Sequence, residues 1–144
     1  GVKKILFING HGGNVEPMGT AMRNINLQMK GIHENADYSN VKTHYDYEKL
    51  LNKDTEIDIR FTSYWEMHDL KFLRSIVKDE ASPGHAGEYE SSIALHLFPK
   101  LVDKDSIKNN ALDTEQDASK EKGEILYKDV IQKYSVLINE MLKS

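Results

Sequence analysis

The sequence predicts an α/β fold built on a parallel sheet. Three observations support this: an apolar run leads into a glycine-rich turn and a helix, an alternating segment follows later, and helical patterns close the chain. A strand, a turn and a helix in this order open a βαβ unit, whose two strands run parallel. Because two strands do not make an independent sheet covered on both faces, we expect residues 1–144 to form a single domain that is part of a larger sheet.

The first strand is expected at residues 2–9, where the apolar run Ile5 to Ile8 is too short for a helix. Such a run is typical of a strand buried on both faces, as in parallel sheets. Three glycines within residues 10–13 then favour a tight turn. From residue 16 to residue 30 apolar side chains recur at helical spacing, so this segment is expected to be a helix.

The later elements are predicted from helical spacing and from strand-like alternation of apolar residues. Residues 33–55 are polar and have no clear period, so we expect a long excursion with one helical turn. Further along we expect a second strand at 57–64, a short helix at 70–78, a helix ending near 98, a loop at 99–110 and a last helix at about 119–142.

Composition excludes several functional classes. Lys and Arg number 19 and Asp and Glu number 23, so the net charge of −4 argues against nucleic acid or an anionic membrane as a partner. The absence of cysteine excludes disulfides, thiolate metal sites and cysteine nucleophiles. No apolar run is long enough to span a membrane and no signal-peptide hydrophobic region is present, so we expect a cytoplasmic protein.

The first group of residues that could bind a ligand or take part in catalysis is the N-G-H-G-G-N loop at residues 9–14, which follows the first strand. Open α/β sheets place their ligands at the carboxyl ends of their strands. His11 is the one large side chain of the turn, and a neutral imidazole there can bind a metal or act as a base. The alternative is a phosphate-binding turn in which His11 is incidental, although neither G-x-G-x-x-G nor the Walker lysine is present.

The second group is the H-A-G-E-Y-E-S-S segment at residues 85–92, which opens a helix. Glu90 is in helical register with Ala94 and Leu97, so it is expected to face inward, where it must be paired or bound to a metal. Glu88 would then point about 160° away and serve only as a favourable charge in the first turn.

Three further residues have less specific patterns. Trp65 follows the second strand at the presumed ligand-binding edge and is either a core residue or a wall for a substrate. His68 lies just beyond it and could line a pocket, whereas His96 fits a packed or surface position in a mostly apolar helix.

The loop at 9–14 followed by the segment at 85–92 resembles the creatininase (creatinine amidohydrolase) family, in which N-G-H-G-G-N and H-A-G-x-x-E-[TS]-S occur in this order. Residues 117–124 are also similar to the stretch before the family's last helix. The resemblance runs through nearly the whole chain and corresponds to the carboxyl-terminal half of a family member. It implies part of a three-layer α/β/α fold with a mostly parallel sheet that lacks its amino-terminal strands.

This resemblance implies a metal-dependent hydrolase of C–N bonds in small cyclic or linear amides, in which two divalent ions, Zn²⁺ or Mn²⁺, bridge an activated water. His11 matches a metal-binding histidine and Glu90 the acid of the second motif. His85 matches a catalytic histidine at the substrate, and Trp65 stands where creatininase has an aromatic residue near its substrate. Creatininase has a further glutamate ligand where this chain has Gly13, so Glu90, or Glu88 in its place, would supply that oxygen.

The family also implies a closed homo-oligomer and further ligands (a Glu, a His and a bridging Asp) from its amino-terminal half. We therefore expect the 144-residue chain by itself to bind divalent metal poorly. Two other hypotheses are a catalytically silent fragment or assembly module of such a protein, and a small nucleotide-binding module that uses the glycine loop.

Overall fold

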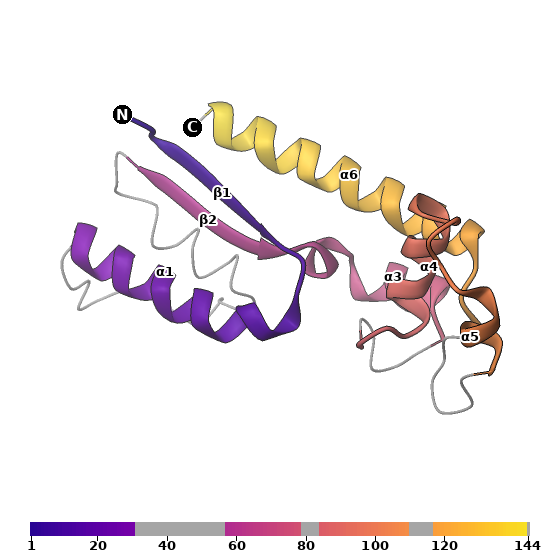
Figure 1. Cartoon of the computed structure of the whole chain (residues 1–144). Helices are drawn as coiled ribbons and strands as arrows, with labels where there is room; N and C mark the ends of the chain where they lie inside the picture. The colour runs from indigo at the N-terminus through magenta and orange to yellow at the C-terminus, as the bar shows by residue number, and fades with distance from the viewer. Residues whose placement is uncertain (31–56, 79–83, 110–116, 144) are drawn as a thin grey trace. The chain divides into compact units, whose positions relative to one another are not determined.

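The computed structural model of the chain contains two compact units (Figure 1). The first consists of Gly1–Glu66 with Leu137–Ser144, and the second of Met67–Val136. The structure describes residues 1–30, 57–78, 84–109 and 117–143. The polar excursion expected at residues 33–55 lies outside the described part of the chain.

The first unit is built on the predicted βαβ sequence. Strand β1 (Lys4–Asn9) pairs in parallel with β2 (Asp58–Ser63), and α1 (Val15–Lys30) lies beside them (Figure 1). A 3-10 turn at Gly12–Asn14 joins β1 to α1. The two strands are in register with Ile5 opposite Ile59 and Phe7 opposite Phe61, so these side chains share one face. Met22 of α1 packs with Ile59 and Phe61 to form the buried core.

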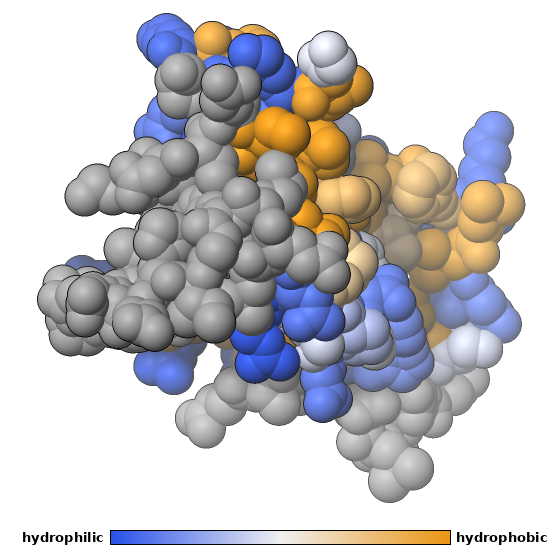
Figure 2. Space-filling model, turned by 90° about the vertical axis from the view of Figure 1, so that its left-hand side faces the viewer, coloured by the Kyte–Doolittle hydropathy of each residue, from blue (hydrophilic) through white to orange (hydrophobic). Residues whose placement is uncertain are grey.

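Strand β1 is less buried than the sequence predicts. Phe7 is 43% exposed and Ile8 is 53% exposed, so the expectation of a strand covered on both faces is wrong at these two positions. Within the described residues β1 pairs along one edge only, with β2, and the side chains of Phe7 and Ile8 are left exposed while Asn9 is buried. Figure 2 shows apolar side chains, in orange, gathered at the surface of one face of the molecule.

The second unit is helical. It contains α3 (Leu70–Ile76), α4 (Glu88–Leu97), α5 (Lys104–Asn109) and the part of α6 (Lys120–Lys143) up to Val136. Asp69 caps α3 by accepting hydrogen bonds from the backbone N–H groups of Lys71 and Phe72.

The prediction of a loop at residues 99–110 is wrong, because α5 forms within this range. Asp103 precedes this helix, and its side chain accepts from the N–H groups of Asp105 and Ser106 at 3.0 and 3.2 Å. An aspartate in this position satisfies the donors that a helix start leaves unpaired, which permits a short helix in a polar stretch.

Helices α4 and α6 approach closely at Gly123. A Cβ atom at this position would lie 1.9 Å from the carbonyl oxygen of Ser92 and 2.9 Å from the Cβ of His96. Glycine is therefore needed here to let the two helices touch through their backbones. The stripe of α6 that is buried includes Leu126, Val130 and Leu137.

The predicted class, α/β with a parallel sheet, is confirmed: the described residues hold a two-stranded parallel sheet and are otherwise mostly helical. The three-layer arrangement and the single domain over residues 1–144 stay predictions. Among the described residues no helix is both long enough and apolar enough to cross a membrane.

Candidate functional site

The N-G-H-G-G-N loop is organised by Asn9, the last residue of β1. Its buried side chain donates to Ser63 Oγ at 3.1 Å, at the end of β2. Its Oδ1 accepts from the backbone N–H of His11 at 3.0 Å and from Asn14 Nδ2 at 3.2 Å. These bonds fix the turn directly after the sheet and leave His11 exposed at the strand end, as the sequence predicts.

The imidazole of His11 lies close to Gly13. A Cβ atom at residue 13 would lie 2.9 Å from His11 Nε2, so a larger residue there would force the ring to move. Gly13 therefore makes room for the ring of His11, at the position where the resemblance to creatininase implies a glutamate ligand. Because His11 is exposed, its imidazole is accessible at the turn.

A hollow of about 300 Å³ lies next to this loop in the first unit. Its wall combines two amide side chains of the loop with apolar side chains of the sheet and of α1. The lining residues are Phe7, Ile8, Asn9, Asn14, Pro17, Met18 and Phe61.

Trp65 also belongs to the first unit, in a 3-10 turn at Tyr64–Met67 that follows β2. Its ring is half-buried and meets the ring of Tyr64 edge-on, with centroids 5.1 Å apart. Glu66 closes the turn by accepting from the backbone N–H of Ser63 at 2.9 Å. Trp65 therefore follows the carboxyl end of β2 as expected, and its role at a substrate stays a prediction.

The H-A-G segment forms a tight turn before α4, and it is held in an unusual backbone conformation. Ala86 has φ 52°, in the left-handed region that favours glycine. Glu90 Oε2 accepts from the N–H of Ala86 at 2.7 Å, and Ser91 Oγ donates to the carbonyl oxygen of Ala86 at 3.0 Å. The turn leaves His85 exposed and places it beside the helix start that carries Glu90.

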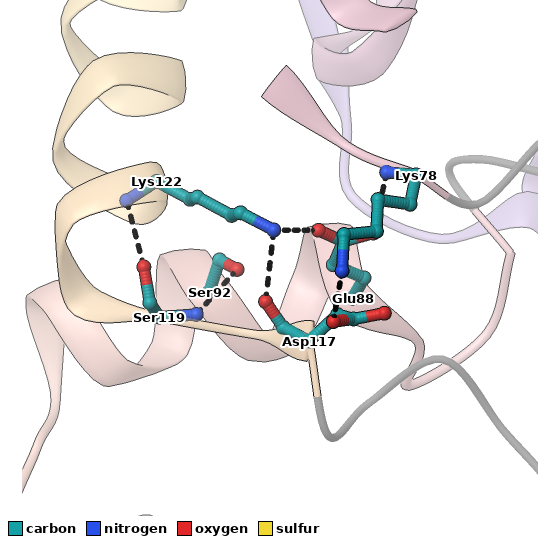
Figure 3. A network of polar contacts seen from close by, with 6 residues as sticks. All are labelled: Lys78, Glu88, Ser92, Asp117, Ser119 and Lys122. Carbon is teal, nitrogen blue, oxygen red and sulfur yellow. Dashed lines mark hydrogen bonds and ion pairs between the residues drawn. The ribbon is translucent and has the colours of Figure 1, made fainter. Parts of the chain in front are cut away.

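The prediction that Glu90 faces inward and Glu88 outward is wrong. Glu88 is fully buried, whereas Glu90 is half-buried. Glu88 Oε1 accepts from Lys122 Nζ, and Glu88 Oε2 accepts from the backbone N–H of Lys78 at 2.7 Å (Figure 3). The carboxylate of Glu88 is thus committed to an internal ion pair, and of the two glutamates Glu90 is the one accessible to a ligand.

The ion pair belongs to a wider polar network around the start of α6 (Figure 3). Lys122 Nζ also donates to the carbonyl oxygen of Asp117 at 2.9 Å, and Lys78 Nζ donates to Asp117 Oδ1 at 2.6 Å. The hydrogen bond from Lys78 lowers the pKa of Asp117, and in turn Asp117 raises the pKa of Lys78. Ser92 Oγ accepts from the N–H of Ser119 at 3.1 Å, which ties α4 to the beginning of α6.

The structure brings His85 and Glu90 together on one turn, while His11 and Trp65 belong to the other unit. A shared site of His11 and Glu90 therefore stays a prediction. Within the described ranges no group of three or more His, Asp or Glu side chains is placed to hold a metal ion.

One buried histidine has a role that the sequence did not indicate. His68, weighed as a pocket residue, is enclosed in the second unit, where its Nδ1 lies 2.7 Å from Asp129 Oδ2 and its Nε2 lies 2.7 Å from Tyr89 OH. Burial lowers the pKa of His68, and the hydrogen bond to Asp129 opposes this only in part. No local sequence pattern indicates this group, because His68 precedes α3 while Tyr89 lies on α4 and Asp129 on α6.

The comparison with protein families identifies the class to which the fold and the two motifs belong. The creatininase family, described as creatinine amidohydrolase, matches residues 1–120, which is most of the chain and includes both motifs. The chain therefore belongs to the creatininase family. Comparisons with curated proteins and with solved structures produced no match.

Proposed function

We propose that this protein is a metal-dependent amidohydrolase that cleaves a C–N bond of a small cyclic or linear amide. Membership of the creatininase family supports an amide-hydrolysing activity. The single structural observation that supports it most directly is the H-A-G turn, where His85 is exposed next to the accessible carboxylate of Glu90. An exposed imidazole next to a half-buried carboxylate on a constrained turn is suited to act on a bound substrate.

The donor atoms of this chain agree in kind with Zn²⁺ or Mn²⁺. His11 offers an imidazole nitrogen and Glu90 a carboxylate oxygen, which are ligand types that both ions accept. A divalent ion, when bound, polarises the amide carbonyl and provides an activated water at neutral pH. Because a zinc site takes at least three protein ligands, the proposal requires ligands in addition to His11 and Glu90.

In this proposal the remaining work falls to residues of the chain itself. His85 moves a proton at its imidazole, toward the nitrogen that leaves as the C–N bond breaks. Glu90 keeps His85 in place by accepting a hydrogen bond from the N–H of Ala86, and its carboxylate would serve as a ligand of the metal. Trp65 forms an apolar wall for the substrate. The proposal also includes a closed homo-oligomer in the cytoplasm, with no nucleic acid or membrane partner.

The test compares the 144-residue chain with the product of the complete reading frame. Bound Zn²⁺ and Mn²⁺ are measured by elemental analysis, and hydrolysis is followed on a panel of lactams, cyclic ureides and linear amides with and without a chelator. We expect chelator-sensitive hydrolysis by the complete product. We also expect His85→Ala to lower turnover by about 100-fold or more and to leave the metal content unchanged.

Two outcomes would contradict parts of the proposal. Loss of metal together with activity in His85→Ala would make His85 a ligand rather than a proton carrier. Absence of metal binding and of hydrolysis in the complete product would overturn the enzyme hypothesis and favour a catalytically silent assembly module.

A further inference from the structure

The second unit contains a linear series of polar contacts that ends at the first turn of α4. Lys133 Nζ lies 2.9 Å from Asp129 Oδ2, and the same carboxylate oxygen lies 2.7 Å from Nδ1 of His68. The other ring nitrogen of His68 lies 2.7 Å from the hydroxyl of Tyr89. Tyr89 stands between Glu88 and Glu90 in the first turn of α4. This series of contacts therefore links α6 to the first turn of α4 through the ring of His68.

The direction of each hydrogen bond follows from the chemistry of its members. An ionised carboxylate only accepts, so Nδ1 of His68 carries the proton that is donated to Asp129. Burial lowers the pKa of His68 and keeps the ring neutral, which leaves a lone pair on Nε2. The hydroxyl of Tyr89 must then donate to Nε2. The ring of His68 thus sets the orientation of the Tyr89 hydroxyl.

The surroundings hold the histidine ring in this orientation. Its side chain has no exposed surface, and the ring of Phe72 stacks on it with centroids 5.7 Å apart and planes 23° apart. Tyr89 is fully buried and meets His68 edge-on at 5.5 Å. Lys133 Nζ also lies 5.5 Å from the centroid of Phe72. A neutral polar ring enclosed in this way, with both nitrogens paired, costs little to bury and is rigid.

We propose that His68 is a positioning residue, which holds the first turn of α4 through Tyr89 and so fixes the turn that carries His85 and Glu90. Two neighbouring side chains, Glu88 and Tyr89, then anchor this turn from inside the unit, the first to Lys122 and the second to His68. The importance of this anchoring for catalysis rests on the function proposed above, whereas the anchoring itself is a property of the fold.

Backbone hydrogen exchange measures the anchoring without a substrate. The reporters are the N–H of Ala86, which donates to Glu90, and the N–H of Ser91, which donates to the carbonyl of Gly87. We expect Tyr89→Phe, which removes one hydroxyl, to speed exchange at both reporters by about tenfold. The matched control is Tyr127→Phe in the same unit, whose ring packs on His96 at 5.7 Å and which should leave both rates unchanged.

A second pair of variants separates positioning from simple packing. His68→Gln keeps an acceptor for the Tyr89 hydroxyl, whereas His68→Met has a similar length and lacks it. We expect the rates of the Gln variant to stay within about threefold of the wild type and those of the Met variant to rise by about tenfold. In the wild type, ring ¹⁵N shifts should show the neutral form of His68 with the proton on Nδ1.

Equal exchange rates in His68→Gln and His68→Met, or in Tyr89→Phe and Tyr127→Phe, would overturn the proposal. On any amide that the complete protein hydrolyses, we expect Tyr89→Phe to lower kcat about tenfold with little change in KM. If no amide is hydrolysed, the proposed function fails while the exchange rates still decide the role of His68. If hydrolysis is found and the exchange rates are unchanged, the positioning role alone is refuted.

Discussion

Replacing Lys122 with Met tests how much the buried ion pair contributes to stability. Glu88 has no exposed surface, and its carboxylate forms an ion pair with the ammonium group of Lys122. Methionine keeps most of the apolar stem of lysine and removes the charge. The variant therefore leaves a buried carboxylate without its ion-pair partner, while the hydrogen bond from the backbone N–H of Lys78 is kept.

The expected magnitude follows from the burial of the two partners. Breaking a buried pair by removing one partner typically costs about 3–5 kcal/mol. The Lys122 side chain is 24% exposed, so water partly solvates the site and the lower end of that range applies. We expect Lys122→Met to lower the free energy of unfolding by about 3 kcal/mol, measured by urea denaturation followed by circular dichroism.

The double variant isolates the pairing from other effects of the substitution. Glu88→Gln removes the charge and keeps an oxygen that can accept from Lys78. In the Glu88→Gln, Lys122→Met double variant no charge is left uncompensated, so we expect a total loss of about 1 kcal/mol and a coupling energy of at least about 2 kcal/mol. Additive losses from the two single variants would refute the reasoning.

The matched control is an exposed pair on the same helix. Lys128 donates to Glu124 at 2.6 Å, and the two side chains are 72% and 44% exposed. Such i,i+4 pairs contribute less than about 1 kcal/mol, so Lys128→Met should change stability little. A loss in Lys128→Met as large as that in Lys122→Met would show that burial is not the cause.

Three further predictions concern the backbone and the buried histidine. Gly123→Ala should destabilise the protein by about 3 kcal/mol in urea denaturation, because the new Cβ would lie 1.9 Å from the carbonyl oxygen of Ser92. The control is Gly12→Ala, since a Cβ at residue 12 would have nothing within 4 Å. Equal losses of stability in the two variants would contradict the close contact between the helices. Ala86→Gly should stabilise the protein by about 0.5 kcal/mol, because relief of the left-handed conformation outweighs the added freedom of the unfolded chain; a loss above about 1 kcal/mol would refute this. Since burial lowers the pKa of His68 below 6.5, the unfolded state takes up a proton first, and stability should fall as the pH drops from 6.5 toward the lowered value in the folded state. The urea midpoint of the wild type should then depend on pH more steeply than that of His68→Gln, and identical slopes would assign the dependence to other groups.

The elements with a strong local period could be predicted from the sequence. The bounds of β1, α1, β2 and α6 lie within a few residues of those expected, because each has an apolar pattern that matches its own geometry. The glycine loop after β1 and the turn before α4 were recognised for the same reason, since glycine marks positions where the chain turns. Helix α5 was missed because it depends on one capping aspartate rather than on an apolar stripe.

The orientation of α4 was decided only by tertiary structure. Its apolar residues suggested that the side with Ala94 and Leu97 faces inward, yet Leu97 is 37% exposed while Glu88 is fully buried. The reason is that polar groups can be buried when a distant partner compensates them, and the partner of Glu88 comes from α6, 34 residues along the chain.

The same distinction applies to the candidate site. The sequence alone identified His11, His85 and Glu90 through motifs whose residues are adjacent, and it indicated the family that the comparison then confirmed. It could not determine which glutamate is accessible or that His68 supports the turn, because both depend on contacts between residues that are remote in sequence. Local periodicity encodes which elements form, whereas the pairing of buried polar groups is decided only when those elements pack.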